Sequence, residues 1–169
     1  MRHKYFLIFI ALFIPFMCIL FLMYVPNIDD FYARKVMLTL DDVKLPAGTE
    51  FVDKTYISGS LIGNGDGIDF LGAILVKSPL SEEELISYYK DNTGLSEVHA
   101  EKLKQNGYSA GNIYLGVDGT ISGYAVKGID RGSLYFINTS EIKEDYYLIY
   151  AFKTDEYPFI SNFDLRGYN

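Results

Sequence analysis

The stretch GNGDG comes closer to a calcium loop than any other part of this sequence, because Asn and Asp alternate with glycine. An EF-hand loop requires an oxygen ligand at its first position and a bidentate acid at its twelfth. With Gly67 at the obligate glycine position, Asn64 and Asp66 fit two ligand positions. Ile62 and Ala73 then occupy the first and twelfth positions, and neither side chain carries an oxygen. We therefore predict a flexible connection between two strands. A loose cation site, formed where this loop meets the similar GVDG loop in space, stays open as an alternative.

The residues that most often carry catalysis or bind transition metals are scarce. The chain has two histidines, His3 and His99, and one cysteine, Cys18. We interpret His99 as a strand residue rather than a general base, and one histidine without a cysteine is too little for a transition-metal site. Pairs of carboxylates remain possible among 22 acidic residues, but no tryptophan is present to form a sugar platform. We predict that the protein is not an enzyme and holds no metal or cofactor.

Tyrosine is the remaining residue type with a possible role in recognition, because its ring is apolar and its hydroxyl is polar. Thirteen of the 15 tyrosines follow residue 25. Strand propensity and core packing explain most of them. Two adjacent pairs are nevertheless the best candidates for contact with a partner: Tyr88, Tyr89, Tyr146 and Tyr147.

The first 25 residues predict a membrane anchor. A short basic flank, residues 1–4, precedes 21 residues without a charge, Tyr5 to Val25. As a helix these 21 residues extend about 32 Å, enough to cross the hydrocarbon core of a bilayer. The run is longer than the apolar part of a usual signal peptide and lacks a small-residue cleavage site. A cleaved signal and a lipoprotein modified at Cys18 stay open as alternatives.

The orientation follows less directly from the basic residues, since Arg2 and Lys4 flank one end and Arg34 and Lys35 follow the other. A tail of four residues normally stays in the cytoplasm, so we expect a single-pass protein with its C-terminal domain outside. That domain contains 13 basic and 22 acidic residues, a net charge of −9, which disfavours nucleic acid as a partner and predicts that the domain as a whole repels anionic lipid. It contains no cysteine, which fits the envelope of a Gram-positive bacterium.

Local patterns predict the elements of the outer domain. Residues 51–61 and 68–78 are expected to be strands, and the second has two apolar faces, as a central strand does. Gly72 within it indicates a bulge or a close packing contact. Ser81 and Glu84 form a capping box at the start of a helix over 81–91, and Asn92 to Gly94 are expected to end it.

The second half of the sequence predicts a meander of short strands, because Asn-Gly and Asp-Gly pairs separate apolar runs. Together these elements predict an α+β fold: one transmembrane helix, then a small, mostly antiparallel sheet with one packed helix. We divide the chain into a basic tail, an anchor, a juxtamembrane connector, an α+β domain and a C-terminal tail: 1–4, 5–25, 26–44, 45–157 and 158–169.

One part of the sequence, LPAGTE followed by GNGDGIDFLGAILVKSPLSEEELISYY, resembles uncharacterised small single-span membrane proteins of Gram-positive bacteria. The similarity covers about residues 45–90. It implies an envelope location and a β-β-α opening, and it brings no activity or catalytic residue.

We hypothesise that the outer domain binds another protein of the cell envelope. The alternatives are a domain that binds a cell-wall glycan or a small ligand, with a weak hydrolytic role, and a structural factor without a discrete ligand.

Overall fold

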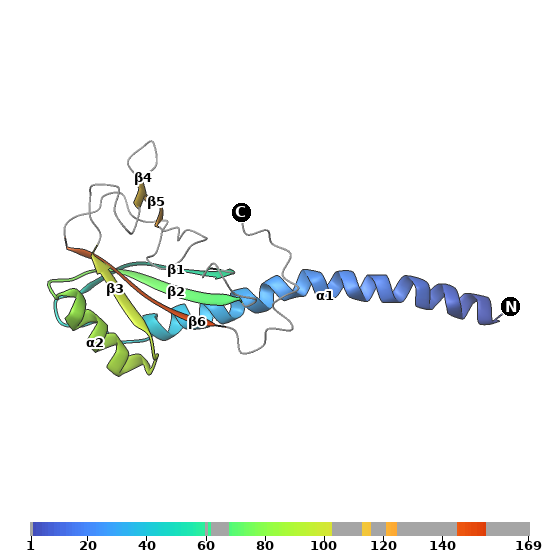
Figure 1. Ribbon diagram of the computed structural model, residues 1–169, viewed down its shortest axis with the longest axis horizontal. Coiled ribbons are helices and arrows are strands. Elements are labelled where there is room, and N and C mark those ends of the chain that lie inside the picture. The colour runs from blue at the N-terminus through green and yellow to red at the C-terminus, as the bar shows by residue number, and fades with distance from the viewer. Residues whose placement is uncertain are drawn as a thin grey trace.

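The computed structural model describes residues 2–59, 61, 68–102, 113–115, 121–124 and 145–154. Figure 1 shows a long helix that projects from a small α+β domain, which confirms the predicted fold class. The elements, in chain order, are α1 (Arg2–Asp41), β1 (Glu50–Gly59), β2 (Asp69–Lys77), α2 (Glu82–Thr93), β3 (Val98–Lys102), β4 (Ile113–Leu115), β5 (Ile121–Tyr124) and β6 (Tyr146–Thr154).

Helix α1 continues without a break from the apolar segment into the domain. The residues that we assigned to a connector, 26–44, are therefore helical as far as Asp41. One side of this part of the helix is buried, at a spacing of three or four residues, as expected for a helix that packs on one face. The buried apolar residues of α1 are Val25, Ala33, Val36, Met37 and Leu40. The C-terminal half of α1 is thus part of the core of the domain.

Four antiparallel strands form the main sheet, in the order β1-β2-β6-β3. The prediction of a simple meander is wrong for the last strand, because β6 lies between β2 and β3 instead of at an edge. Local turn signals report only on neighbouring strands, whereas this position depends on pairing with β2, more than 70 residues earlier in the chain. Strands β4 and β5 pair separately as a two-stranded sheet.

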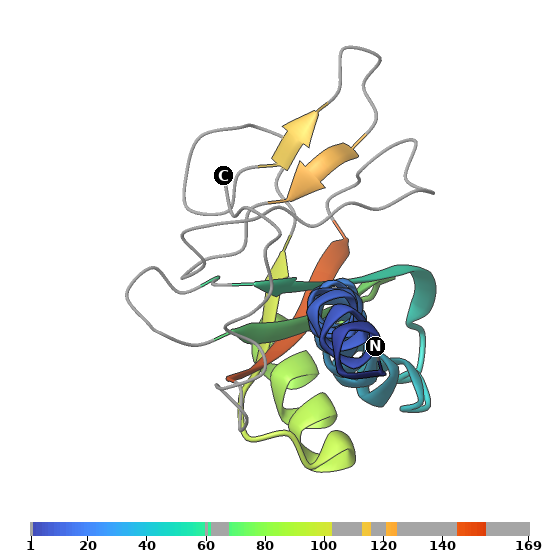
Figure 2. The same cartoon turned by 90° about the vertical axis from the view of Figure 1, so that its right-hand side faces the viewer.

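Both faces of strand β2 are buried, which confirms the prediction of a central strand. On the face toward the helices, Phe70, Ile74 and Val76 pack with residues of α1, α2, β3 and β6. On the other face, Leu71, Ala73 and Leu75 pack with residues of β6. Figures 1 and 2 show α1 and α2 on the first side of the sheet and the β4–β5 pair on the second.

Gly72 makes the close packing contact that its place in a central strand predicts. A Cβ atom at this position would lie 2.1 Å from the backbone nitrogen of Met37 and 2.5 Å from its Cα. Only glycine therefore allows the backbone of α1 to approach the sheet this closely. The contact holds the C-terminal half of α1 directly against strand β2.

Helix α2 begins and ends as the sequence predicts. The Ser81 hydroxyl accepts a hydrogen bond from the Glu84 backbone nitrogen at 3.3 Å, and the Glu84 carboxylate accepts one from the Ser81 nitrogen at 2.8 Å. Gly94 ends the helix in the left-handed conformation, with φ of 68°. Leu85 and Tyr89 are the buried residues of α2.

Candidate functional site

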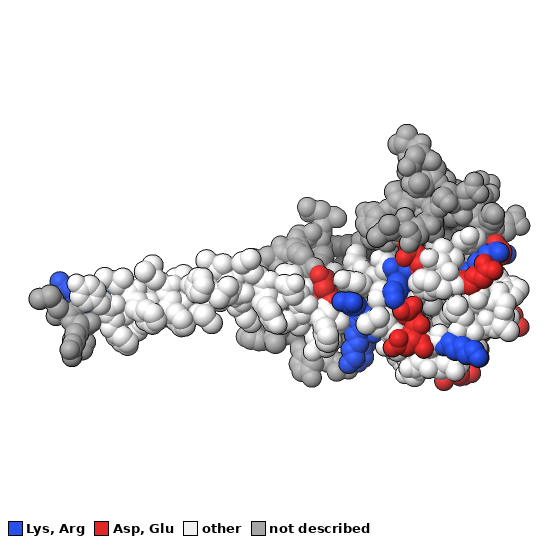
Figure 3. Space-filling view, turned by 180° about the vertical axis from the view of Figure 1, so that it is seen from behind, with Lys and Arg blue, Asp and Glu red and all other residues white. Residues whose placement is uncertain are grey.

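The N-terminal half of α1 is the most unusual surface of the molecule. Helix α1 is long and apolar enough to cross a membrane, with a mean hydropathy of 3.0 over its best 18-residue window. None of that window is buried against the rest of the described chain. Figure 3 shows the same segment as a rod in which charged side chains appear only at the N-terminal tip. Such a surface is stable only where water is excluded from it.

The end of the sheet nearest to this rod contains three acidic residues that are turned away from solvent. Asp29 on α1 is fully buried, and Asp69 at the start of β2 is 5% exposed. Asp69 accepts a hydrogen bond from the backbone nitrogen of Leu61 at 3.2 Å. Asp30 accepts one from the Ser58 hydroxyl at 3.0 Å, which joins α1 to the end of β1. The flanks of the GNGDG loop therefore lie beside the point where α1 enters the domain.

The loop itself, residues 62–67, and the Asp118-Gly119 turn lie outside the described residues. Among the residues that the structure describes, no group of three or more His, Cys, Asp or Glu side chains is arranged to hold a metal ion. The predicted absence of a calcium site is therefore not tested.

Strand β1 is an edge of the four-stranded sheet, and it carries the exposed aromatic residues of the sheet. Phe51 is 43% exposed and Tyr56 is 39% exposed. Their pairing partners in β2 are Val76 and Gly72, which face the helices, so both rings lie on the α1 side of the sheet. Among the described residues no strand pairs with the outer edge of β1, and unpaired backbone donors and acceptors of this kind allow strand addition.

Strand β1 also carries features that limit pairing with other chains. Its register with β2 shifts between Phe51 and Asp53, and such a bulge twists an edge. Lys54 lies within the same strand and forms an ion pair with Asp41 at the end of α1. A charged residue and a bulge on an edge strand disfavour indiscriminate pairing. The edge thus carries two of the features by which sheets avoid indiscriminate pairing.

The four tyrosines that we predicted as contact residues do not form one surface. Tyr89 is fully buried and Tyr147 is 6% exposed, and both belong to the core between the sheet and the helices. Tyr88 is half-buried, and its hydroxyl donates a hydrogen bond to the Lys44 carbonyl at 2.8 Å. Tyr146 is half-buried on the opposite face of the sheet. Tyr89 and Tyr147 are thus core residues, because each is the member of its pair that points inward.

His99 lies among aromatic rings rather than beside a nucleophile. Its ring stacks on Tyr150 and Phe152, with centroids 5.0 and 5.6 Å away. The Tyr150 hydroxyl donates a 2.6 Å hydrogen bond to Glu101. Burial, and then this bond, raise the pKa of the Tyr150 hydroxyl far above its ordinary value. The group is therefore a packed cross-strand cluster in which Tyr150 stays protonated.

Two short matches to nucleophile motifs bear on the prediction that the protein is not an enzyme. Ser87 and Lys90 have the S-x-x-K spacing, but both are exposed on α2, Ser87 near its middle and Lys90 in its last turn. The sequence GYSAG, residues 107–111, has the G-x-S-x-G spacing and lies outside the described residues. A nucleophile elbow leads into a helix, whereas strand β4 begins at Ile113. That the protein is not an enzyme therefore stays a prediction.

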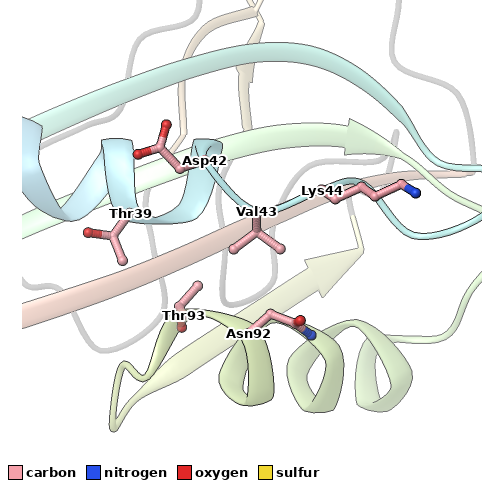
Figure 4. Close-up of a pocket in the computed structure, with 6 residues that line it drawn as sticks. All are labelled: Thr39, Asp42, Val43, Lys44, Asn92 and Thr93. Carbon is pink, nitrogen blue, oxygen red and sulfur yellow. The ribbon is translucent and has the colours of Figure 1, made fainter.

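A pocket of about 450 Å³ lies at the far end of the domain from the apolar rod, between the C-terminal ends of α1 and α2. It is lined by Thr39, Asp42, Val43, Lys44, Asn92 and Thr93. Figure 4 shows Val43 directed toward α2, while the charged ends of Asp42 and Lys44 extend away from it. The Thr39 and Thr93 hydroxyls donate to carbonyls of their own helices. The pocket therefore lacks the convergent polar groups of a small-molecule site.

Comparison of the chain with protein-family models, with curated proteins and with solved structures finds no match. The resemblance to single-span Gram-positive proteins thus remains a prediction. Sequence reasoning missed Phe51 and Tyr56 as candidate contact residues, because both belong to an ordinary strand pattern. Only the position of β1 at an edge distinguishes them, and strand order depends on long-range pairing.

Proposed function

We propose that this protein is a single-pass membrane protein whose α+β domain lies outside the cytoplasm and binds another protein of the cell envelope. The observation that carries the proposal is the continuity of α1, which is both an apolar rod and a core helix of the domain. A flexible linker would allow a domain many positions relative to the bilayer. A continuous helix instead holds the domain at one distance from the bilayer and within one range of tilt.

The surface that best fits a partner is the α1 side of the β1 edge, around Phe51 and Tyr56. Strand β1 runs back from the far end of the domain toward the rod, as the bond between Ser58 and Asp30 indicates. A tethered edge strand meets other membrane-anchored chains at a high effective concentration, so modest contact area is sufficient for binding. Aromatic side chains beside unpaired backbone groups supply both affinity and register.

Photocrosslinking in intact cells tests the proposal. A photoreactive phenylalanine analogue at Phe51 or Tyr56 is expected to trap the same membrane neighbour. The same analogue at Ser87 or Lys90, exposed positions on α2, is the matched control and is expected to trap none. Equal adducts from both strand and helix positions, or no adduct at β1, would contradict binding at this edge and favour a glycan or small ligand.

The orientation has its own test. The chain has a single cysteine, so Cys18→Ser followed by Lys90→Cys gives one reactive thiol in the domain. A membrane-impermeant maleimide is expected to label that thiol in intact cells. Labelling only after the cells are broken would place the domain in the cytoplasm.

A further inference from the structure

The side of α1 that faces away from the sheet presents three exposed residues just beyond the apolar rod: Phe31, Arg34 and Lys35. We call these three residues the juxtamembrane stripe. They are spaced three and four residues apart, so they lie on the same side of the helix. Phe31 is 62% exposed, although its neighbour Tyr32 packs on Phe70 in the core. The exposed ring thus places an apolar group beside the two cations on this side of α1.

The stripe lies just beyond the predicted span along α1. The uncharged run of α1 extends from Tyr5 to Ile28, three residues past the predicted end of the span at Val25. At roughly 1.5 Å per residue, Phe31 lies about 4.5 Å beyond Ile28 and about 9 Å beyond Val25, and Arg34 and Lys35 lie about 9 and 10.5 Å beyond Ile28. The headgroups extend roughly 5–7 Å beyond the hydrocarbon on each side. Side chains on a helix slope toward its N-terminus, so the two cations reach back across roughly one helical turn toward the phosphates.

The charges around the stripe favour an anionic ligand. Within the described part of the chain, neither Arg34 nor Lys35 forms an ion pair. Two acids at the same end of the domain, Asp29 and Asp69, are buried, and the partly exposed Asp30 accepts a hydrogen bond from the Ser58 hydroxyl. Figure 3 shows basic side chains where the rod meets the domain, with acidic side chains beside them. A domain with a net negative charge thus presents, among its described residues, two unpaired cations at this end of α1.

We propose that the juxtamembrane stripe binds the phosphate groups of anionic lipids in the leaflet that faces the domain, with the Phe31 ring among the headgroups. This inference rests on the proposed membrane span. It assigns a second role to α1, because contacts at the headgroups fix how deep the helix sits and how far it tilts. The height at which strand β1 is presented then depends on the lipid composition of the membrane.

A single introduced tryptophan tests the proposal, since the chain contains none. Full-length Phe31→Trp protein is reconstituted into vesicles of phosphatidylcholine and phosphatidylglycerol, with a trace of either lipid labelled with dansyl on its acyl chain. The attraction of one basic residue to an anionic membrane surface corresponds to about a fivefold change in the binding equilibrium. Energy transfer from the tryptophan of this variant is therefore expected to be several times stronger to labelled phosphatidylglycerol than to labelled phosphatidylcholine. The preference is expected to vanish when Arg34→Gln and Lys35→Gln are added, and to weaken with salt.

Two controls separate this inference from the proposed span. Adding Lys44→Gln and Lys90→Gln removes two exposed charges at the far end of the domain and is expected to leave the preference unchanged. A separate Phe13→Trp variant reports on the rod, and its fluorescence is expected to be quenched by lipids brominated deep in their acyl chains. If the fluorescence of Phe13→Trp is not quenched, the span itself is wrong. If it is quenched and Phe31→Trp transfers energy equally to both labelled lipids, the headgroup contact alone is overturned.

Discussion

The two halves of α1 belong to one helix but differ in where their apolar side chains lie around the helix axis. From Tyr5 to Tyr24 the side chains are apolar on every side, and almost all are exposed. From Val25 to Leu40 only one side is buried and apolar, while the other carries residues such as Arg34 and Lys35. The first pattern suits a helix surrounded by lipid, and the second suits a helix between a protein core and a polar medium. The backbone is helical in both halves, so the distribution of apolar side chains around the helix reflects what surrounds each half.

The largest expected effect lies where the second half of α1 meets the sheet. Gly72→Ala places a Cβ atom 2.1 Å from the Met37 nitrogen, so either the helix or strand β2 must move. We expect a loss of at least about 4 kcal/mol in the free energy of unfolding, measured by denaturant titration of the full chain in detergent. Gly94→Ala is the control, since its Cβ meets nothing within 4 Å and only the left-handed backbone is strained. We expect a cost of about 1 kcal/mol there. Equal losses in the two variants would mean that α1 does not pack on Gly72.

One substitution in each half of α1 is expected to affect either membrane insertion or the stability of the domain, but not both. Leu12→Arg places a charge in the exposed apolar half and is expected to disfavour membrane insertion by about 3 kcal/mol. It should leave the denaturant midpoint of the domain unchanged. Leu40→Arg places a charge at a fully buried core position and should lower the midpoint without reducing insertion. Membrane fractionation and denaturant titration of both variants provide the comparison. If each variant fails in both assays, the two halves are not independent.

Tyr89 tests the packing beneath the C-terminal end of α1. Within the described residues its hydroxyl is buried without a hydrogen-bond partner. Burial, followed by the nearby Tyr88 and Asp41, raises the pKa of Tyr89 from 10 to about 12. Tyr89→Phe removes this unsatisfied group and is expected to stabilise the domain by about 1 kcal/mol at neutral pH.

The same pair of proteins, wild type and Tyr89→Phe, is expected to differ in how stability changes with pH. The unfolded chain loses the Tyr89 proton near its ordinary pKa, whereas the folded chain holds it until about pH 12. The wild-type chain should therefore lose roughly 3 kcal/mol relative to Tyr89→Phe as the pH rises through this range. Parallel stability curves for the two proteins would show that the hydroxyl is solvated.

The smallest effect concerns helix α2, at its N-terminal cap. Ser81→Ala removes the acceptor for the Glu84 nitrogen and is expected to cost about 1 kcal/mol. Ser81→Thr keeps an acceptor at the same position and should restore most of this loss. Ser87→Ala, at an exposed position of the same helix, should change the midpoint little. An unchanged midpoint in Ser81→Ala would show that the cap contributes nothing.

The features that sequence predicts here are those that depend on nearby residues. The capping box of Ser81, the end of α2 at Gly94 and the two apolar faces of β2 all follow from spacing within one element. Gly72 is recognisable as a packing or bulge position because glycine is unusual in a central strand. Its partner, the backbone of Met37, is not predictable, since the contact joins residues 35 positions apart.

The features that sequence misses depend on which strands lie side by side. The burial of Tyr147 follows from the insertion of β6 between β2 and β3, and the exposure of Phe51 and Tyr56 follows from the edge position of β1. Adjacent tyrosines indicate that one ring points inward, but the sequence does not say which ring or whether the other is covered. The candidate contact residues are therefore on β1 in the structure, whereas the sequence favoured the two tyrosine pairs.

A cysteine scan along α1 in native membranes tests the central claim most directly. In a Cys18→Ser background, single cysteines are placed from residue 5 to residue 41 and treated with a membrane-impermeant maleimide. The account predicts no labelling from 5 to 24. Beyond Val25 it predicts labelling with a helical period, strong at Arg34 and Lys35 and absent at Val36 and Leu40. Labelling within the first segment, or labelling without a period in the second, would contradict a single helix that spans the membrane and enters the domain core.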